Sequence, residues 1–396
     1  MQSPLKYSCL FGGGAIRGLA YVGALRALEE LEIEIDTIGG SSVGSVFAML
    51  VACGYKSYEL ENIFLKVNYD LFRDIQLGFN RDIALSKGQI FTDWLNELIS
   101  KKLNTTSENP ATFKDFDKNL VIITTNLEKF APQEFSKLKT PTFEIAKAVK
   151  ISSSMPGLMA PYKLGENSLA DGDLQKGSPM WKLSENLSYM DSRILEFRLE
   201  GSAGETNSKS IISFLNTVYS CFTEVATNFI SEIYGQNDKF DILKIETGNV
   251  FFADFNLNKD ARRQLIESGY EQTMAYFKVF LPQKKKKLLS IYEKIYKYLK
   301  NSQKGLKSNN VEETQWWIGD LFILLCENKE FVDPVIYQEL VFLKNLILDS
   351  VTTILFIHTR FKDKQRLEEE YNKLLKIISL KISEIQYFLQ KENVEL

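Results

Sequence analysis

The chain has 396 residues, of which 44% are hydrophobic, and its formal net charge is −3. This length predicts two domains, or one large domain with an extension, and the apolar content is sufficient for a sizeable core. The small negative charge argues against a nucleic-acid binder. The four cysteines are far apart and form no CxxC pair, so we expect buried thiols in a reducing compartment, without a zinc site or a disulfide framework.

The first part of the chain alternates predicted strands with predicted helices. Short runs of β-branched and aromatic residues indicate strands, and longer amphipathic or small-residue segments indicate helices. Such alternation is typical of a layered α/β/α domain with a mostly parallel central sheet. In chain order we predict strand 7–11, helix 17–31, strand 33–38, helix 42–53, strand 119–125, helix 143–151, strand 193–200 and strand 240–245.

The character of the chain changes after Pro282. Residues 283–396 contain no convincing strand and predict about four helices. We therefore predict an α/β domain at 1–281 and an all-α domain at 282–396. Small polar residues at 202–208 predict a mobile surface loop. The N-terminus has no charged start followed by an apolar core, so we expect no signal peptide, and no apolar stretch approaches the ~18 to 20 residues that cross a bilayer.

A glycine-rich loop, Gly12-Gly13-Gly14-Ala15-Ile16-Arg17-Gly18, links the first predicted strand to the first predicted helix. Glycines leave backbone N–H groups uncovered, and the N-terminus of a helix favours anions. The loop therefore suits a nucleotide phosphate, a lipid phosphate or a developing oxyanion. No P-loop pattern is present, and the glycine spacing is one residue longer than a dinucleotide fingerprint. A reductase would also need Tyr296 and Lys300, which lie in the predicted helical extension.

The second predicted strand leads into Gly40-Ser41-Ser42-Val43-Gly44, which fits the pattern Gly-x-Ser-x-Gly. A strand before this pattern and a helix after it form the setting of a nucleophile elbow, in which a tight turn exposes the serine hydroxyl. We therefore predict Ser42 as a nucleophile, with Gly40 and Gly44 as the residues that permit the turn.

A serine nucleophile needs a base, and the single histidine, His358, lies on a predicted helix in the last quarter of the chain. This argues against a Ser-His-Asp triad. A carboxylate within hydrogen-bonding distance can also take the proton. The best-placed carboxylate is Asp171, which follows a short apolar strand and precedes Gly172. An isolated Asp-Gly is usually a plain turn, but the upstream run 151–161, with Ser-Ser-Ser-Met-Pro-Gly, favours a functional residue.

Together these motifs, Gly-Gly-Gly-x-x-Arg-Gly, Gly-x-Ser-x-Gly, Ser-Ser-x-Pro-Gly and Asp-Gly, resemble the patatin-like phospholipase family over about residues 5–280. The resemblance implies a Ser–Asp dyad, in which Ser42 matches the nucleophile and Asp171 the base. It also implies an oxyanion hole at Gly13-Gly14-Ala15, although the family more usually has glycine where Ala15 stands.

Two further residues of these motifs carry open alternatives. Arg17 matches the basic residue of the glycine loop, where it either braces the loop or contacts a phospholipid phosphate. The family usually has Asp-Gly-Gly or Asp-Gly-Ala where this chain has Asp171-Gly172-Asp173. We expect Asp173 to point to solvent; a carboxylate close to Asp171 would instead raise the pKa of Asp171.

The resemblance implies a phospholipase A-type hydrolase that cleaves fatty-acyl esters through an acyl-enzyme, without a metal or a cofactor. Its expected substrate is a phospholipid or another acyl lipid. The alternatives are a catalytically weak or inactive lipid-binding or regulatory protein and, on the glycine loop alone, an oxidoreductase. We expect a cytoplasmic, peripherally membrane-associated protein; delivery into another cell is a further possibility.

Three segments are candidates for contacts beyond the site. The lysine-rich stretch 283–300 has an apolar helical face and is a candidate for membrane contact, although packing of that face on the protein is the more ordinary outcome. Residues 211–230 are a candidate lid, again with ordinary core packing favoured. The helices beyond 300, with Trp316, Trp317 and Phe322, are candidates for binding an activating protein, although core packing is the more ordinary outcome.

Overall fold

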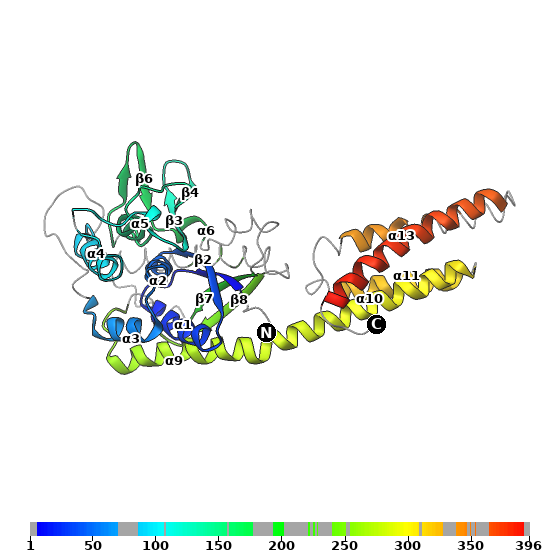
Figure 1. The fold of residues 1–396 in the computed structure, drawn as a ribbon, viewed down its shortest axis with the longest axis horizontal. Coiled ribbons are helices and arrows are strands. Elements are labelled where there is room, and N and C mark those ends of the chain that lie inside the picture. The colour runs from blue at the N-terminus through cyan, green and yellow to red at the C-terminus, as the bar shows by residue number, and fades with distance from the viewer. Residues whose placement is uncertain are drawn as a thin grey trace. The chain divides into compact units, whose positions relative to one another are not determined.

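The computed structural model shows two compact units, which divide between Phe277 and Lys278 (Figure 1). The predicted boundary lies at residues 281 and 282, and the functional assignment of the two domains stays a prediction. The structure describes residues 6–69, 86–106, 108–156, 158–176, 193–201, 221, 225, 228, 240–250, 254–308, 311–327, 338–346, 349, 353 and 364–391. The predicted loop at 202–208, nearly all of the candidate lid and His358 lie outside these residues.

The first unit is built on a mixed sheet of eight described strands in the order β5-β6-β3-β2-β1-β7-β8, with β4 paired to β3. Strands β8, β7, β1, β2 and β3 run parallel, whereas β4, β5 and β6 pair antiparallel. The strands are β1 (Lys6–Phe11), β2 (Glu34–Ser41), β3 (Asn119–Asn126), β4 (Ala131–Ser136), β5 (Tyr162–Leu164), β6 (Asn167–Ala170), β7 (Arg193–Glu200) and β8 (Phe240–Glu246).

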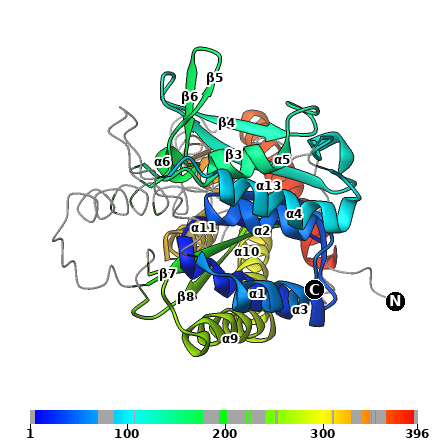
Figure 2. The same ribbon diagram turned by 90° about the vertical axis from the view of Figure 1, so that its left-hand side faces the viewer.

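Helices of the first unit form two groups, with α1, α3 and α9 in one and α2, α4 and α5 in the other (Figure 2). Helix α2 packs on β1, β2 and β3, and α9 packs on α1 and β8. A short 3-10 helix, Ala15–Leu19, precedes α1. The helices are α1 (Ala20–Glu30), α2 (Val43–Ala52), α3 (Ser57–Lys66), α4 (Gln89–Leu103), α5 (Ile145–Ser152), α6 (Asp173–Lys176) and α9 (Lys259–Ala275).

The α/β prediction is confirmed, and every predicted strand and helix of this unit is present with ends shifted by a few residues. Continuous apolar runs such as Leu120 to Ile123 become strands because both sides of the sheet are covered. Strands β4 and β5 and helices α3 and α4 were not predicted. Their sequences mix polar and apolar residues, and their conformation depends on what they pack against.

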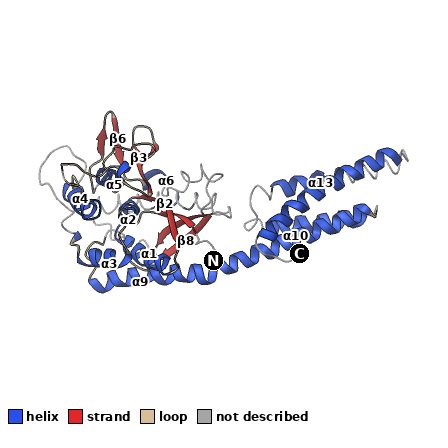
Figure 3. Cartoon of the chain, viewed as in Figure 1, coloured by secondary structure: helices blue, strands red, loops and turns tan. Residues whose placement is uncertain are grey.

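The second unit is helical in its described residues except Ser308, a turn residue after α10 (Figure 3). It comprises α10 (Leu281–Lys307), α11 (Val311–Glu327), α13 (Lys364–Lys391) and a helical segment at 338–346, with a π-helical turn, Tyr276–Phe280, at the division between the units. Its apolar core includes Tyr371, Leu374, Ile378 and Ile382, which confirms the helical spacing read from the sequence. Among the described helices, none combines the length and apolarity that crossing a membrane demands.

The apolar face of α10 is not available for membrane contact. Ile291, Tyr292, Ile295 and Leu299 are buried in the core of the helical unit. The hypothesis that this face enters a lipid surface is therefore wrong, and the ordinary alternative of core packing holds. Sequence could not separate the two because an apolar stripe has the same spacing whether it meets lipid or other helices.

Candidate functional site

Ser42 lies at the turn between the last residue of β2 and the first residue of α2. Its backbone has φ 51° and ψ −132°, a conformation that residues other than glycine rarely adopt. Such strain costs on the order of 1–3 kcal/mol and persists only where the surrounding structure holds it. The predicted strand–turn–helix setting of a nucleophile elbow is therefore present around this serine.

The two glycines of the motif are required by close packing of the backbone. A Cβ on Gly40 would lie 2.3 Å from the carbonyl oxygen of Gly44, and a Cβ on Gly44 would lie 1.9 Å from that of Phe11. Both distances are far below van der Waals contact, so any side chain would force the turn apart. The loop after β1 and the turn after β2 therefore pack directly against each other.

Asp171 is hydrogen-bonded to Ser42, whose Oγ donates to Asp171 Oδ2 at 2.9 Å. Asp171 follows β6 and is fully buried, whereas Ser42 is 6% exposed. The N–H of Asp173 donates to Asp171 Oδ1 at 2.9 Å, and the N–H of Asp171 donates to the carbonyl of Ser154 at 3.1 Å. The carboxylate is thus held with one oxygen toward the serine hydroxyl.

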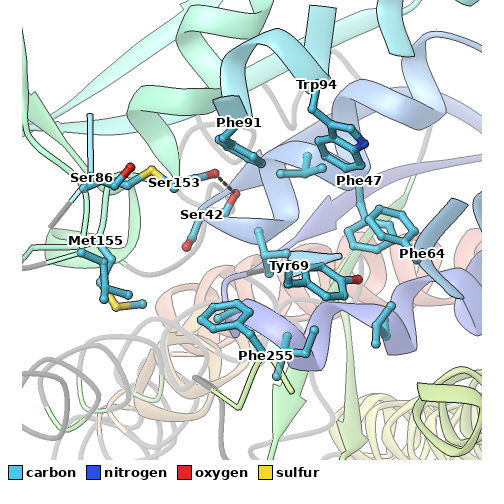
Figure 4. A pocket seen from close by; sticks show the side chains of 17 residues that line it. Ser42, Phe47, Phe64, Tyr69, Ser86, Phe91, Trp94, Ser153, Met155 and Phe255 are labelled. Atoms are coloured by element: carbon cyan, nitrogen blue, oxygen red, sulfur yellow. Dashed lines mark hydrogen bonds between the residues drawn. The ribbon is translucent and has the colours of Figure 1, made fainter. Parts of the chain in front are cut away.

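Two serines from the end of α5 also hold the elbow. The N–H of Ser42 donates to Ser152 Oγ at 3.0 Å. Ser153 Oγ donates to the carbonyl of Ser42 at 3.2 Å, and Figure 4 shows Ser153 next to Ser42. Ser152 Oγ itself donates to the carbonyl of Ile123 in β3. The sequence marked the run 151–161 as significant, but the contacts of these two hydroxyls come only from the fold.

The glycine loop approaches the serine from β1. A Cβ on Gly13 would lie 3.2 Å from Ser42 Cβ, so the loop backbone runs beside this serine. Gly14 has φ 142° and Ala15 has φ 48°, which are unusual backbone angles. Within the described part of the chain, the N–H groups of Gly13, Gly14 and Ala15 donate to no protein acceptor. The predicted role of these three donors in an oxyanion hole stays a prediction.

Arg17 is buried at 8% exposure, and its Nε donates to the carbonyl of Val250 at 2.8 Å. It is not among the residues that line the cavity described below. Of the two roles considered for it, bracing the loop fits this position, and contact with a phospholipid phosphate stays a prediction.

Asp173 does not point to solvent, so that expectation is wrong. It is 6% exposed and accepts a hydrogen bond from Ser41 Oγ at its Oδ1. Burial, followed by the nearby charge of Asp171, holds the pKa of the Asp173 carboxyl well above its ordinary range. The direction of the chain after Gly172 decided this, because the short helix α6 turns Asp173 back toward β2.

A cavity of about 360 Å³ opens beside Ser42 (Figure 4). Its lining is mainly apolar, and four of the lining residues carry a hydroxyl: Ser42, Ser86, Ser153 and Tyr69. The remaining lining residues are Ala15, Ile16, Leu19, Val43, Val46, Phe47, Phe64, Phe91, Trp94, Met155, Leu158, Met159 and Phe255. This volume lies in the range of small-molecule sites, and the lining suits an apolar chain rather than a polar group.

Aromatic side chains form one wall of the cavity, and sequence analysis identified none of them as site residues. Phe47 stacks on Phe64 with centroids 4.9 Å apart, and Trp94 contacts both Phe64 and Phe91. They come from α2, α3 and α4, so their separation in the chain hid the grouping. The only local signal was an excess of aromatic residues in segments without clear periodicity.

Two of the four cysteines depart from the expectation of buried thiols. Cys9 and Cys53 are buried, and burial raises the pKa of both thiols, that of Cys53 to about 12. Cys221 and Cys326 are exposed. Within the described residues, no three His, Cys, Asp or Glu side chains are grouped as metal ligands would be.

The fold and the site together define an α/β protein with an elbow serine that is hydrogen-bonded to a buried aspartate. Comparison with protein families matches residues 10–183 to the patatin-like phospholipases. A protein of Acanthamoeba polyphaga mimivirus, R571, is 30% identical over 276 residues, which cover 68% of this chain and 92% of that protein. The chain therefore belongs to the patatin-like phospholipase family.

Two other relatives carry names that state an activity. The probable lipid hydrolase 463L of Invertebrate iridescent virus 6 is 30% identical over 187 residues, covering 45% of this chain and 63% of that protein. The cGAMP-activated phospholipase of Vibrio cholerae is 26% identical over 204 residues, covering 45% of this chain and 56% of that protein. Both names state that the relative hydrolyses lipids.

Proposed function

We propose that the protein is a serine lipid acyl hydrolase of phospholipase A type, in which Ser42 and Asp171 act as a dyad. The observation that carries the proposal is the 2.9 Å hydrogen bond from Ser42 Oγ to a fully buried carboxylate beside an apolar cavity. A positioned base of this kind can take the serine proton in the transition state.

In the first half-reaction, Ser42 Oγ attacks the ester carbonyl carbon, and its proton passes to Asp171 Oδ2. The bond from the carbonyl carbon to the alcohol oxygen then breaks, and the alcohol leaves with that proton. In the second half-reaction, water attacks the acyl-enzyme while Asp171 takes its proton, and the proton returns to Ser42 Oγ as the fatty acid leaves.

The tetrahedral intermediate carries a negative oxygen that needs donors. The glycine loop passes Ser42 at Gly13, and the N–H groups of Gly13, Gly14 and Ala15 have no protein acceptor among the described residues. One such donor typically contributes about 3 kcal/mol to stabilisation of the transition state. Ala15 can replace the family's more usual glycine at this position, because its backbone already has the positive φ of 48° that glycine adopts readily.

The cavity supports an acyl chain as the group held next to the serine. Its lining has few polar atoms, so a phosphate or a sugar placed there would lose its hydration without replacement. The polar head group of the lipid would then remain at the open side, where it contributes less to recognition.

A fluorophosphonate probe tests the dyad directly, in parallel with fatty-acid release from phosphatidylcholine vesicles. Labelling and release are expected in the wild type and absent in Ser42→Ala. Ser308→Ala, an exposed serine of the helical unit, serves as the matched control and should behave as the wild type. Absence of both labelling and release in the folded wild-type protein would reject the proposal.

One observation favours the alternative of a weak or inactive lipid-binding protein. Asp173 places a second buried carboxyl next to Asp171, and two such groups do not both ionise easily. The alternative predicts vesicle or lipid binding by the wild type without probe labelling. Probe labelling of the wild type therefore distinguishes the two functions.

We also propose contact with an anionic lipid surface through the lysine face of α10. Lys286, Lys297 and Lys304 recur at 11- and 7-residue intervals, which place them on one side of the helix, opposite its buried face. Lys294, Lys300 and Lys307 flank them, and all six are exposed. Each lysine near an anionic surface contributes about 1 kcal/mol.

Co-sedimentation with phosphatidylserine-containing vesicles tests this surface. Replacing Lys286, Lys297 and Lys304 by Gln should weaken binding by roughly a hundredfold. The same change at Lys101, Lys114 and Lys139, which are exposed in the first unit, is the matched control. Equal binding by both triple variants would reject the proposed contact of the α10 lysine face with anionic lipid. An activating protein partner, a cytoplasmic location and delivery into another cell stay predictions.

A further inference from the structure

The hydrogen-bonding pattern behind Ser42 distinguishes two buried carboxyls. Asp171 accepts from Ser42 Oγ and from the N–H of Asp173. In the described part of the chain, Asp173 accepts from Ser41 Oγ alone. Donors stabilise the ionised form of a carboxyl, so Asp171 is the member of the pair that holds the negative charge.

The carboxyl of Asp173 also contacts the glycine loop. A Cβ on Gly13 would lie 1.5 Å from Asp173 Oδ2 and 2.7 Å from its Cγ. The acid therefore occupies the space that a side chain at Gly13 would take. Through Ser41 and Gly13, this one side chain touches the residue before the nucleophile and the first residue of the proposed oxyanion hole.

The charges around Asp173 come from several elements. Asp171 and Glu196, a fully buried residue of β7, both raise the pKa of Asp173, whereas the hydrogen bond from Ser41 lowers it; burial is the largest cause. The pKa of Tyr21 in α1 is raised by the charges of Asp173 and Glu196 and lowered by that of Arg198 in β7, so these side chains interact with one another. Strands β3 and β4 also pack on α6; β3 has no titratable side chain, and β4 has Glu134, which accepts from Ser136.

We propose that Asp173 is a positioning residue that works as an uncharged acid, and that its ionisation switches the acyl-transfer site off. The proposal rests on the proposed function of Ser42 and Asp171. In the uncharged form, Asp173 fills the space beside Gly13 without adding a charge. In the ionised form, it places a negative charge next to the N–H donors that must stabilise the oxyanion, and next to Asp171.

The pH dependence of kcat, measured with wild type and Asp173→Asn, tests the switch. Each profile is scaled to its own maximum, so that only its shape is compared. The wild-type kcat should fall by about tenfold for each pH unit on the alkaline side, whereas Asp173→Asn, which cannot ionise, should stay level there. Asp260→Asn, at an 85% exposed side chain, is the control and should keep the wild-type profile. Identical profiles for wild type and Asp173→Asn would overturn the inference.

Ser41→Ala provides a second variant with an opposite expectation. It removes the donor that stabilises ionised Asp173, so the alkaline fall should move to higher pH rather than disappear. A shift to lower pH would contradict the proposed role of Asp173.

Thermal unfolding gives a readout that needs no activity. The pKa of Asp173 is raised in the folded chain, so the stability that its uncharged form contributes is present below the ordinary aspartate pKa and is lost as pH rises through the raised value. The Tm of the wild type should therefore fall relative to that of Asp173→Asn as pH increases. A constant difference would overturn the inference. If the Tm of the wild type falls relative to that of Asp173→Asn but the wild type hydrolyses no ester, the proposed function would be rejected. The inference that Asp173 is uncharged would still stand.

Discussion

The two units bury different kinds of residue. The α/β unit encloses Asp171, Asp173, Glu196 and Asp241, whereas the buried polar residues described in the helical unit are Ser302 and Thr314. A buried charge is costly unless it is paired, so a fold retains it for structure or for chemistry. Asp241 serves structure, because it pairs with Arg193 at 2.8 Å. Behind Ser42, Asp171 instead accepts a hydrogen bond from the Ser42 hydroxyl, and Asp173 accepts one from the Ser41 hydroxyl. The proposed chemistry therefore lies in the α/β unit.

The largest test of this contrast is Asp171→Asn. The amide has nearly the same shape, but it cannot take the Ser42 proton. We expect kcat to fall by about 10²- to 10⁴-fold, as for loss of a general base. Fatty-acid release from vesicles measures the effect, and an unchanged Tm would show that the fold survives. A loss below tenfold would mean that another group is the base.

Gly23→Ala tests how closely the α/β unit is packed. A Cβ on Gly23 would lie 1.7 Å from the carbonyl oxygen of Ile266, where α1 crosses α9. The helices would have to separate, so we expect a loss of about 2 kcal/mol or more in the free energy of unfolding. Chemical denaturation measures this loss. Wild-type stability in the variant would refute the close crossing.

Val46→Phe tests whether the cavity binds the acyl chain. Val46 lies one turn after Ser42 in α2 and lines the cavity, which a phenyl group would partly fill. Long-chain esters should lose at least about tenfold in kcat/KM relative to acetyl esters. The acetyl ester serves as the internal control, and an equal loss on both esters would argue against acyl binding in the cavity.

The smallest expected effect lies in the helical unit, at Gly319→Ala. Gly319 is in α11, and a Cβ there would meet no atom within 4 Å. Alanine should therefore stabilise the helix by about 0.5–1 kcal/mol, the reverse of Gly23→Ala. Trp316 and Trp317, on the same helix, provide the fluorescence signal for unfolding. Destabilisation would show that this face of α11 is covered.

Local patterns predicted the part of the site that is built from consecutive residues. The elbow at Ser42, the glycine loop and the Asp171 turn each lie within one short segment, where glycine spacing and apolar runs determine the backbone. The same holds for β3 and β7, whose apolar runs predicted their location. The hairpin β5–β6 is also local, with Leu164 paired to Asn167, but β5 is short and largely exposed, so the sequence indicated only its second strand.

Sequence alone determined the chemistry available to this protein: one elbow serine, a loop of uncovered amides, an aspartate after a strand, and a single histidine too remote to predict a triad. Tertiary structure decided what surrounds that chemistry. It brought Phe64, Trp94 and Phe255 into one cavity and buried the apolar face of α10 in a helical core. It also turned Asp173 toward Ser41 rather than solvent. Burial is a property of packing between distant segments, and no local pattern specifies which neighbour will cover a side chain.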